Sequence, residues 1–200
     1  MLKNPLRLTV TSVILAGGIF AGYVLMHSSS VSAVLVSPTG NPVKEIQGYR
    51  NWLKVNPEPQ LMDLRTRLLC ARPSSPTGVD VNGPTNPHHE KYITVYVNDV
   101  GKNAMMEQVK PQFPVGSVIV KEKLPDKSSQ SPELLTVMIK KEKGFNAPSG
   151  DWEYLVLDGK GESVGERGKL ESCQSCHLAT PQTDYIFRSY LPDEVRNKLK

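Results

Sequence analysis

The second half of the chain contains four short, mostly hydrophobic segments separated by polar and turn residues, and this pattern predicts four β-strands. These segments are 92–97, 117–121, 134–140 and 152–157, and they are rich in β-branched and aromatic residues. A hairpin-type loop at 144–150 separates the last two, and Asp158-Gly159-Lys160-Gly161 forms a turn after them. Strands joined by short connections predict an antiparallel sheet.

Apolar residues spaced three and four positions apart predict short helices outside this run. One spans about 60–70, a second spans 101–109 after an Asn98/Asp99 cap, and a helical turn closes the chain at 192–199. The apolar positions are Leu61, Leu64 and Leu68 in the first helix and Met105, Met106 and Val109 in the second. Four prolines in 72–90 predict a surface loop. The predicted fold class is α+β, with a mainly antiparallel β-sheet and a few short helices.

The N-terminal segment has the order of charges and apolar residues that is typical of a secretory signal. Lys3 and Arg7 precede an apolar run over 8–26, and small residues ending at Ala33 follow it. We expect residues 1–33 to be either a cleaved signal peptide or a retained N-terminal membrane anchor. In both cases the rest of the chain is periplasmic or otherwise extracytoplasmic, because the positive flank stays inside.

This assignment divides the remaining chain into three parts. Residues 34–44 read as a linker, 45–192 as the folded domain, and 193–200 as a C-terminal tail. A formal net charge of +4 without any dense block of Lys and Arg argues against a nucleic-acid partner. We expect a membrane partner only through an uncleaved N-terminal segment.

Cys173-Gln174-Ser175-Cys176-His177 carries the clearest chemistry in the chain. The spacing C-x-x-C-H is typical of covalent c-type haem attachment. Two thiols three positions apart can each add to one vinyl group of the same porphyrin. The imidazole of His177 can then coordinate the iron as the proximal ligand. The motif therefore predicts a mono-haem c-type cytochrome.

Three other interpretations use the same cysteines. A redox dithiol needs a βαβ context and gives the adjacent His177 no role. A zinc site would need further ligands, and the downstream candidates are His88 and His89 without a second C-x-x-C. A disulfide between such close residues encloses a very small loop and stabilises little.

Several other residues have side chains that could bind a metal, and we expect most of them to have a packing role instead. Cys70, flanked by Leu68 and Leu69, is expected to be a buried small hydrophobe, with a reactive or dimer-forming thiol as the alternative. The sixth-ligand candidates by type are Met105, Met106, Met138, His88 and His89. The methionines fit a helix core side or a strand interior, and the histidines fit an exposed loop.

Several segments together resemble the cytochrome P-460 family over about residues 45–192. They are Tyr49-Arg50-Asn51-Trp52, Tyr92 to Val97, Gly116 to Glu122, Asp151-Trp152-Glu153-Tyr154, Leu170 to His177 and Asp184 to Leu191. C-x-x-C-H is shared with every c-type cytochrome, so the strand patterns around it make the resemblance specific.

The resemblance implies a mainly β homodimer with one haem c per chain, five-coordinate through His177. Characterised members oxidise hydroxylamine, and their haem carries an additional covalent bond from a lysine. By the pattern Val-x-Val-Lys-Glu, that lysine corresponds to Lys121. The related c′-beta cytochromes lack this chemistry and bind nitric oxide or carbon monoxide in an apolar pocket.

Strand alternation is consistent with the role that the resemblance implies for Lys121. It places Lys121 with Ser117 and Ile119 on one face, opposite Val118, Val120 and Glu122. Burial at a haem edge would lower the pKa of the lysine and free its amine to attack. The alternative is a solvated lysine at the end of a strand.

Glu171 is the second catalytic candidate, because it lies two residues before Cys173 and therefore near the porphyrin. A carboxylate there could act as a general base toward a nitrogen substrate. The alternative is a charge facing solvent or a haem propionate. The resemblance also implies a distal arginine, but Ile93 occupies the strand position where we expect it.

Three functions follow from these residues. The first is oxidation of hydroxylamine at an open iron site, with Lys121 and Glu171 as catalytic residues and another cytochrome c as a redox partner. The second is binding of nitric oxide without turnover, and the third is simple electron transfer, which needs a protein sixth ligand. The optical spectrum of the reduced protein separates all three.

Overall fold

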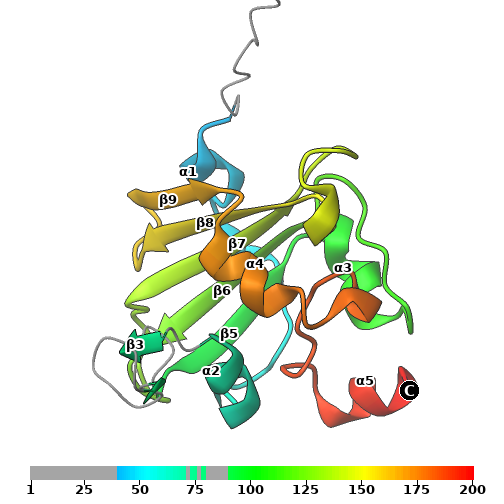
Figure 1. Ribbon diagram of the computed structural model, residues 1–200. Coiled ribbons are helices and arrows are strands. Elements are labelled where there is room, and N and C mark those ends of the chain that lie inside the picture. The colour runs from blue at the N-terminus through cyan, green and yellow to red at the C-terminus, as the bar shows by residue number, and fades with distance from the viewer. Residues whose placement is uncertain (1–39, 71–72, 76–77, 80–89) are drawn as a thin grey trace, which may run out of the picture. The chain divides into compact units, whose positions relative to one another are not determined.

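The computed structural model describes residues 40–70, 73–75, 78–79 and 90–200, and its centre is a seven-stranded antiparallel sheet (Figure 1). The strands run in the order β1-β5-β6-β7-β8-β9, and β2 also pairs with β5. Their bounds are Leu53–Lys54 for β1, Gln60–Leu61 for β2, Tyr92–Val97 for β5, Val118–Leu124 for β6, Leu134–Lys140 for β7, Trp152–Asp158 for β8 and Val164–Gly168 for β9. The α+β fold class and the antiparallel pairing predicted from the sequence are confirmed.

Short helices and one small hairpin complete the described chain. The helices are α1 Pro42–Glu45, α2 Leu64–Cys70, α3 Asp99–Met106, α4 Glu171–His177 and α5 Asp193–Lys198, with 3-10 turns at Tyr49–Asn51 (η1), Ala147–Ser149 (η2) and Pro181–Thr183 (η3). The hairpin pairs β3 Pro73–Ser75 with β4 Gly78–Val79. It lies within 72–90, where we expected a loop without strands.

The register of the sheet gives its two faces different roles. One row runs across the sheet through Val95, Lys121, Thr136 and Val156. The neighbouring row, through Val97, Ile119, Met138 and Tyr154, points to the same side because successive residues alternate. Figure 1 shows α4 crossing the sheet on this side, with α2 next to it.

Each face packs its own apolar cluster. The first cluster joins the face toward α4 to α3 and the C-terminal segment, and it includes Ile93, Met105, Trp152 and Ile186. The second lies on the opposite face, where Tyr96, Val120 and Leu155 pack with Ile46 and Tyr49. The β-sheet is therefore the middle layer, and α4 lies on one side of it.

The predicted strands 92–97 and 134–140 have the observed bounds, and the other two are longer than predicted. The second predicted strand, 117–121, continues to Leu124, and the fourth, 152–157, continues to Asp158. We did not predict β9, because it contains two glycines and two charged residues. It is held to β8 through the pairs from Tyr154↔Gly168 to Leu157↔Val164.

The helix predicted over 60–70 is wrong in its start and in its buried face. Gln60 and Leu61 pair with β5, and the helix begins at Leu64. Asp63 fixes this start, because its carboxylate accepts hydrogen bonds from Thr66 N at 2.9 Å and Thr66 Oγ1 at 2.6 Å. Among the side chains described in this segment Met62 and Thr66 are buried, whereas Leu61, Leu64 and Leu68 are 47%, 57% and 50% exposed.

The second predicted helix, 101–109, is shifted toward the N-terminus. The side chain of Asn98 accepts from Gly101 N at 3.1 Å, so α3 starts at Asp99 and ends at Met106. The predicted cap and the burial of Met105 are confirmed. Val109 lies beyond the helix and is exposed.

The ends of the folded part differ from the predicted linker and tail. Residues Thr39–Lys200 form one compact unit. Helix α1 begins at Pro42, within the predicted linker, and Val195 and Leu199 of the predicted tail pack against the first cluster. The predicted signal or anchor, 1–33, lies outside the described residues. Within the described ranges, the structure contains no helix of the length and hydropathy needed to cross a bilayer.

Candidate functional site

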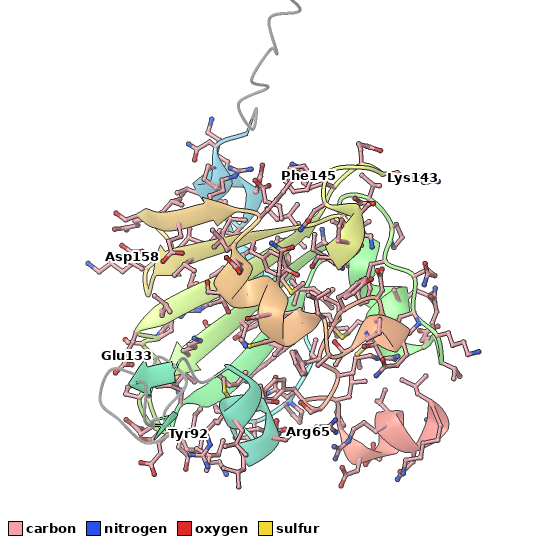
Figure 2. The ribbon with its side chains drawn as sticks, in the orientation of Figure 1. Arg65, Tyr92, Glu133, Lys143, Phe145 and Asp158 are labelled. Atoms are coloured by element: carbon pink, nitrogen blue, oxygen red, sulfur yellow. The ribbon has the colours of Figure 1, made fainter. Side chains whose placement is uncertain are left out.

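A cavity of about 460 Å³ lies between the sheet and α4. Strands β6, β7 and β8 supply one wall, and α4 with the segment after it supplies the other. Figure 2 shows the two ends of β7 and β8, with Glu133 and Asp158 at one end and the loop of Lys143 and Phe145 at the other. The volume of the cavity is within the range of pockets that bind small organic molecules and cofactors.

Helix α4 presents the three residues of the C-x-x-C-H motif to this cavity. Cys173, Cys176 and His177 stand at positions i, i+3 and i+4, which share one face of a helix. All three line the cavity, and the two thiols are not joined to each other. The predicted grouping of these residues at one site is therefore present in the fold.

His177 lines the cavity, and a hydrogen bond determines which of its two ring nitrogens is left to bind a metal. Its Nδ1 lies 2.6 Å from the backbone oxygen of Tyr185, and because a carbonyl only accepts, Nδ1 carries the proton. This leaves the lone pair of Nε2 for a metal. The rings of Tyr154 and Phe187 pack against the imidazole at centroid distances of 5.5 and 5.1 Å.

Electrostatics keep the ligating groups neutral. Desolvation is the main cause that lowers the pKa of His177 to about 4, with Lys121 adding to it, so the imidazole is uncharged at neutral pH. Burial raises the pKa of the Cys173 thiol, against the opposing charges of Lys121 and Lys123. Addition of a thiol across a vinyl double bond takes up both the sulfur and its hydrogen, so the attachment needs no leaving group.

Strand β6 brings two lysines to the same cavity. Lys121 faces it beside Val95 and Thr136, as alternation predicted. Lys123, two residues along on the same face, also lines it and is only 3% exposed. Glu122 lies on the opposite face, where it accepts hydrogen bonds from Tyr49 Oη at 2.6 Å and Arg50 Nε at 2.9 Å.

The acidic candidate Glu171 faces solvent, which is the alternative given for it above. Glu171 is the exposed first residue of α4 and is not part of the cavity lining. Glu166, from β9, lines the cavity instead. Sequence reasoning missed Glu166 because it missed the strand, and the alternation of Val164, Glu166 and Gly168 was too weak a signal.

The sixth-ligand candidates are also separated by the fold. Met105 and Met138 line the cavity, and Met106 does not. Ile93 is fully buried in the first cluster, and none of the described lining residues is an arginine. His88, His89 and the side chain of Cys70 lie outside what the structure describes.

The residues present fit a covalently attached haem better than a zinc ion. Two thiols and an imidazole share one helix face above an apolar cavity that includes Val95, Ile119 and Met138. Within the described residues there is no cluster of three or more His, Cys, Asp and Glu side chains that could hold a metal ion. The antiparallel sheet also lacks the βαβ context of a redox dithiol.

Comparison with known proteins agrees with this geometry. The family model for cytochrome P460 matches residues 46–188, which include the sheet, α4 and the loop that holds His177. No curated protein matches the chain. The match covers most of the chain, and the family implies covalently bound haem c. The chain is therefore a c-type haem cytochrome and belongs to the cytochrome P460 family.

Proposed function

We propose that this protein is an exported enzyme that oxidises hydroxylamine at an open haem iron site. The observation that carries the proposal is that Lys121 lines the same cavity as Cys173, Cys176 and His177. A lysine at this place could bond covalently to the porphyrin, which is the modification expected for hydroxylamine-oxidising members. We assign Cys173 and Cys176 to the thioethers and His177 to the iron.

When bound, the haem supplies a coordination position for the nitrogen of hydroxylamine and a route for its electrons to an external acceptor. Oxidation of hydroxylamine releases protons and an equal number of electrons, so the reaction needs a base and an electron acceptor. We assign the acceptor role to a partner protein such as another cytochrome c.

The chain itself must then accept protons and exclude water. Among the described lining residues the one carboxylate is that of Glu166, on the exposed edge strand β9, so we assign it the role of general base that the sequence suggested for Glu171. Val95, Ile119 and Met138 supply apolar walls, which keep the site dry and strengthen electrostatic interactions within it.

The test compares Lys121→Met with the matched control Lys123→Met in haem-loaded protein. We expect the reduced wild type to have a Soret band far to the red, and Lys121→Met to return it to the position of an ordinary haem c. Lys123→Met should keep the red-shifted band. A wild-type protein with an ordinary spectrum and an unmodified Lys121 in peptide mapping would contradict the lysine cross-link and the oxidase assignment.

A second candidate function is binding of nitric oxide without turnover. It is favoured by the apolar walls of the cavity and by the absence of arginine from its described lining. A five-coordinate high-spin spectrum, tight binding of nitric oxide and no oxidation of hydroxylamine would support it. Simple electron transfer would instead give a low-spin spectrum with Met105 or Met138 as sixth ligand.

Export and assembly are part of the same proposal. Residues 1–33 would direct the chain across the membrane and be cleaved after Ala33 or kept as an anchor, and the mature protein would form a homodimer. Mass spectrometry of the mature N-terminus and light scattering of the haem-loaded protein test these two points. A mature protein that still begins at Met1 would contradict cleavage after Ala33.

A further inference from the structure

The segment that accepts the hydrogen bond from His177 has an unusual backbone. Asp184 and Tyr185 both have positive φ angles, 52° and 65°, in succession. Residues other than glycine adopt this conformation at an energetic cost, and they keep it only where the surrounding structure holds them. The carbonyl of the second, Tyr185, is the one that meets His177 Nδ1.

The side chain and carbonyl of Asp184 are held from three directions. Lys140 Nζ lies 2.7 Å from both carboxylate oxygens, and the pair is 14% and 7% exposed. The backbone N–H of Phe113 donates to Oδ2 at 2.9 Å. Trp152 Nε1 donates to the backbone oxygen of Asp184 at 2.8 Å, and Lys140 Nζ lies 5.0 Å from the centroid of that indole.

Tyr185 is half-buried and has contacts of its own that hold it. Its N–H donates to the carbonyl of Thr180 at 2.9 Å. Gly150 packs against its ring, because a Cβ added to this glycine would lie 2.4 Å from Tyr185 Cδ2 and 3.0 Å from Asp184 Oδ1. The end of β7, the loop before β8 and β8 itself therefore all fix the direction of one carbonyl group.

We propose that the Lys140–Asp184 ion pair, together with Trp152, is a positioning clamp for the iron ligand His177. By holding Asp184 and Tyr185 in their left-handed conformation, the clamp aims the Tyr185 carbonyl at Nδ1 and keeps that hydrogen bond short. A strong bond to Nδ1 raises the basicity of Nε2 and stabilises oxidised iron. The inference rests on His177 as the iron ligand and is independent of hydroxylamine oxidation.

The experiment measures the Fe–His stretching frequency of the reduced, haem-loaded protein by resonance Raman spectroscopy. We expect Lys140→Met and Asp184→Asn to lower this frequency, and Lys140→Arg to keep it near the wild-type value. Lys141→Met is the matched control, because Lys141 also pairs with a buried carboxylate, Glu153 at 3.5 Å, but does not contact the clamp. It should leave the frequency unchanged.

Gly150→Ala gives a second readout that involves no change of charge. It should push on Tyr185, lower the same frequency and raise the midpoint potential of the haem. The direction in which the midpoint potential changes is also informative in Lys140→Met. Loss of a cation by itself lowers the potential, whereas a weaker hydrogen bond to His177 raises it.

The clamp is contradicted if Lys140→Met and Gly150→Ala take up haem with unchanged frequency. It is also contradicted if Lys141→Met lowers the frequency as much as Lys140→Met does. If Asp184→Asn does not fold, the frequencies of Lys140→Met and Gly150→Ala test the clamp without it. A failure of the hydroxylamine assay leaves these spectra interpretable, so the two proposals fail separately.

Discussion

Glu166 and Glu171 differ in their relation to the cavity although they are close in sequence. Glu166 lies in β9 and lines the cavity, whereas Glu171 begins α4 and does not, although both residues are exposed. Proximity to Cys173 along the chain therefore does not place a carboxylate near the bound cofactor. Glu166 lies at the exposed edge of the cavity lining, and Glu171 lies outside that lining.

This difference predicts opposite results for two conservative substitutions. Glu166→Gln should lower kcat/KM for hydroxylamine oxidation by roughly 10²–10⁴-fold, because an amide cannot accept the proton. Glu171→Gln should leave the rate within about twofold of the wild type. Steady-state assays with an excess of electron acceptor measure both, and a larger loss in Glu171→Gln would restore the role suggested by the sequence.

The cysteines predict the behaviour of the haem under denaturation. Cys173→Ala and Cys176→Ala should each keep haem bound through the remaining thioether, and the double variant should release it into acid acetone. Intact-mass measurement after extraction checks this. Release of the haem from denatured wild-type protein would contradict covalent attachment.

Site residues were predictable where local sequence determines their position. Cys173, Cys176 and His177 follow from one turn of chain, and the facing of Lys121 follows from strand alternation. Glu166 and the carbonyl of Tyr185 reach the site through β8–β9 pairing and a left-handed turn. Neither feature has a strong local pattern, so neither was predicted.

At the level of elements, an ion pair reinforces the edge of the sheet. Glu153 on β8 is 1% exposed, and its carboxylate accepts from Arg167 Nε at 2.7 Å and Nη2 at 2.9 Å. Arg167 belongs to β9, so this bidentate contact ties the edge strand to its neighbour. Lys141 lies farther from the same carboxylate, at 3.5 Å.

We expect Arg167→Met to lower the free energy of unfolding by about 3–5 kcal/mol, because it leaves a buried carboxylate without its main partner. The matched control is Arg196→Met, which breaks the exposed pair with Asp193 and should cost about 0–1 kcal/mol. Urea unfolding of both variants measures the difference. Equal losses would show that the β8–β9 pair contributes no more than a surface contact.

Strands were easier to predict than helices in this chain. Strands β6 and β7 are mostly buried and rich in β-branched and other apolar residues, and this composition identifies them as strands. The start of α2 is determined by Asp63 and by pairing of Leu61 with β5, which override the leucine spacing. Tertiary contacts therefore determine the bounds of those elements whose hydrophobic pattern covers only a few residues.

For the molecule as a whole, the C-terminal helix is part of the folded unit. Val195 and Leu199 pack against the cluster that also contains Tyr190 and Leu191. Truncation after Pro192 should therefore reduce the free energy of unfolding of the haem-loaded protein by roughly 2 kcal/mol, from the apolar area exposed. Thermal unfolding, with removal of Lys200 as the control, measures the effect. An unchanged midpoint would make 193–200 a dispensable tail.

The register of β6 has a consequence for how such a protein can change over evolution. Positions 119, 121 and 123 meet the cofactor side, and positions 118, 120 and 122 support the opposite layer. Substitutions in the first set can alter reactivity while the second set preserves the architecture. Oxidases and gas carriers can thus diverge by exchanging alternate residues of one strand, without any rearrangement of the scaffold.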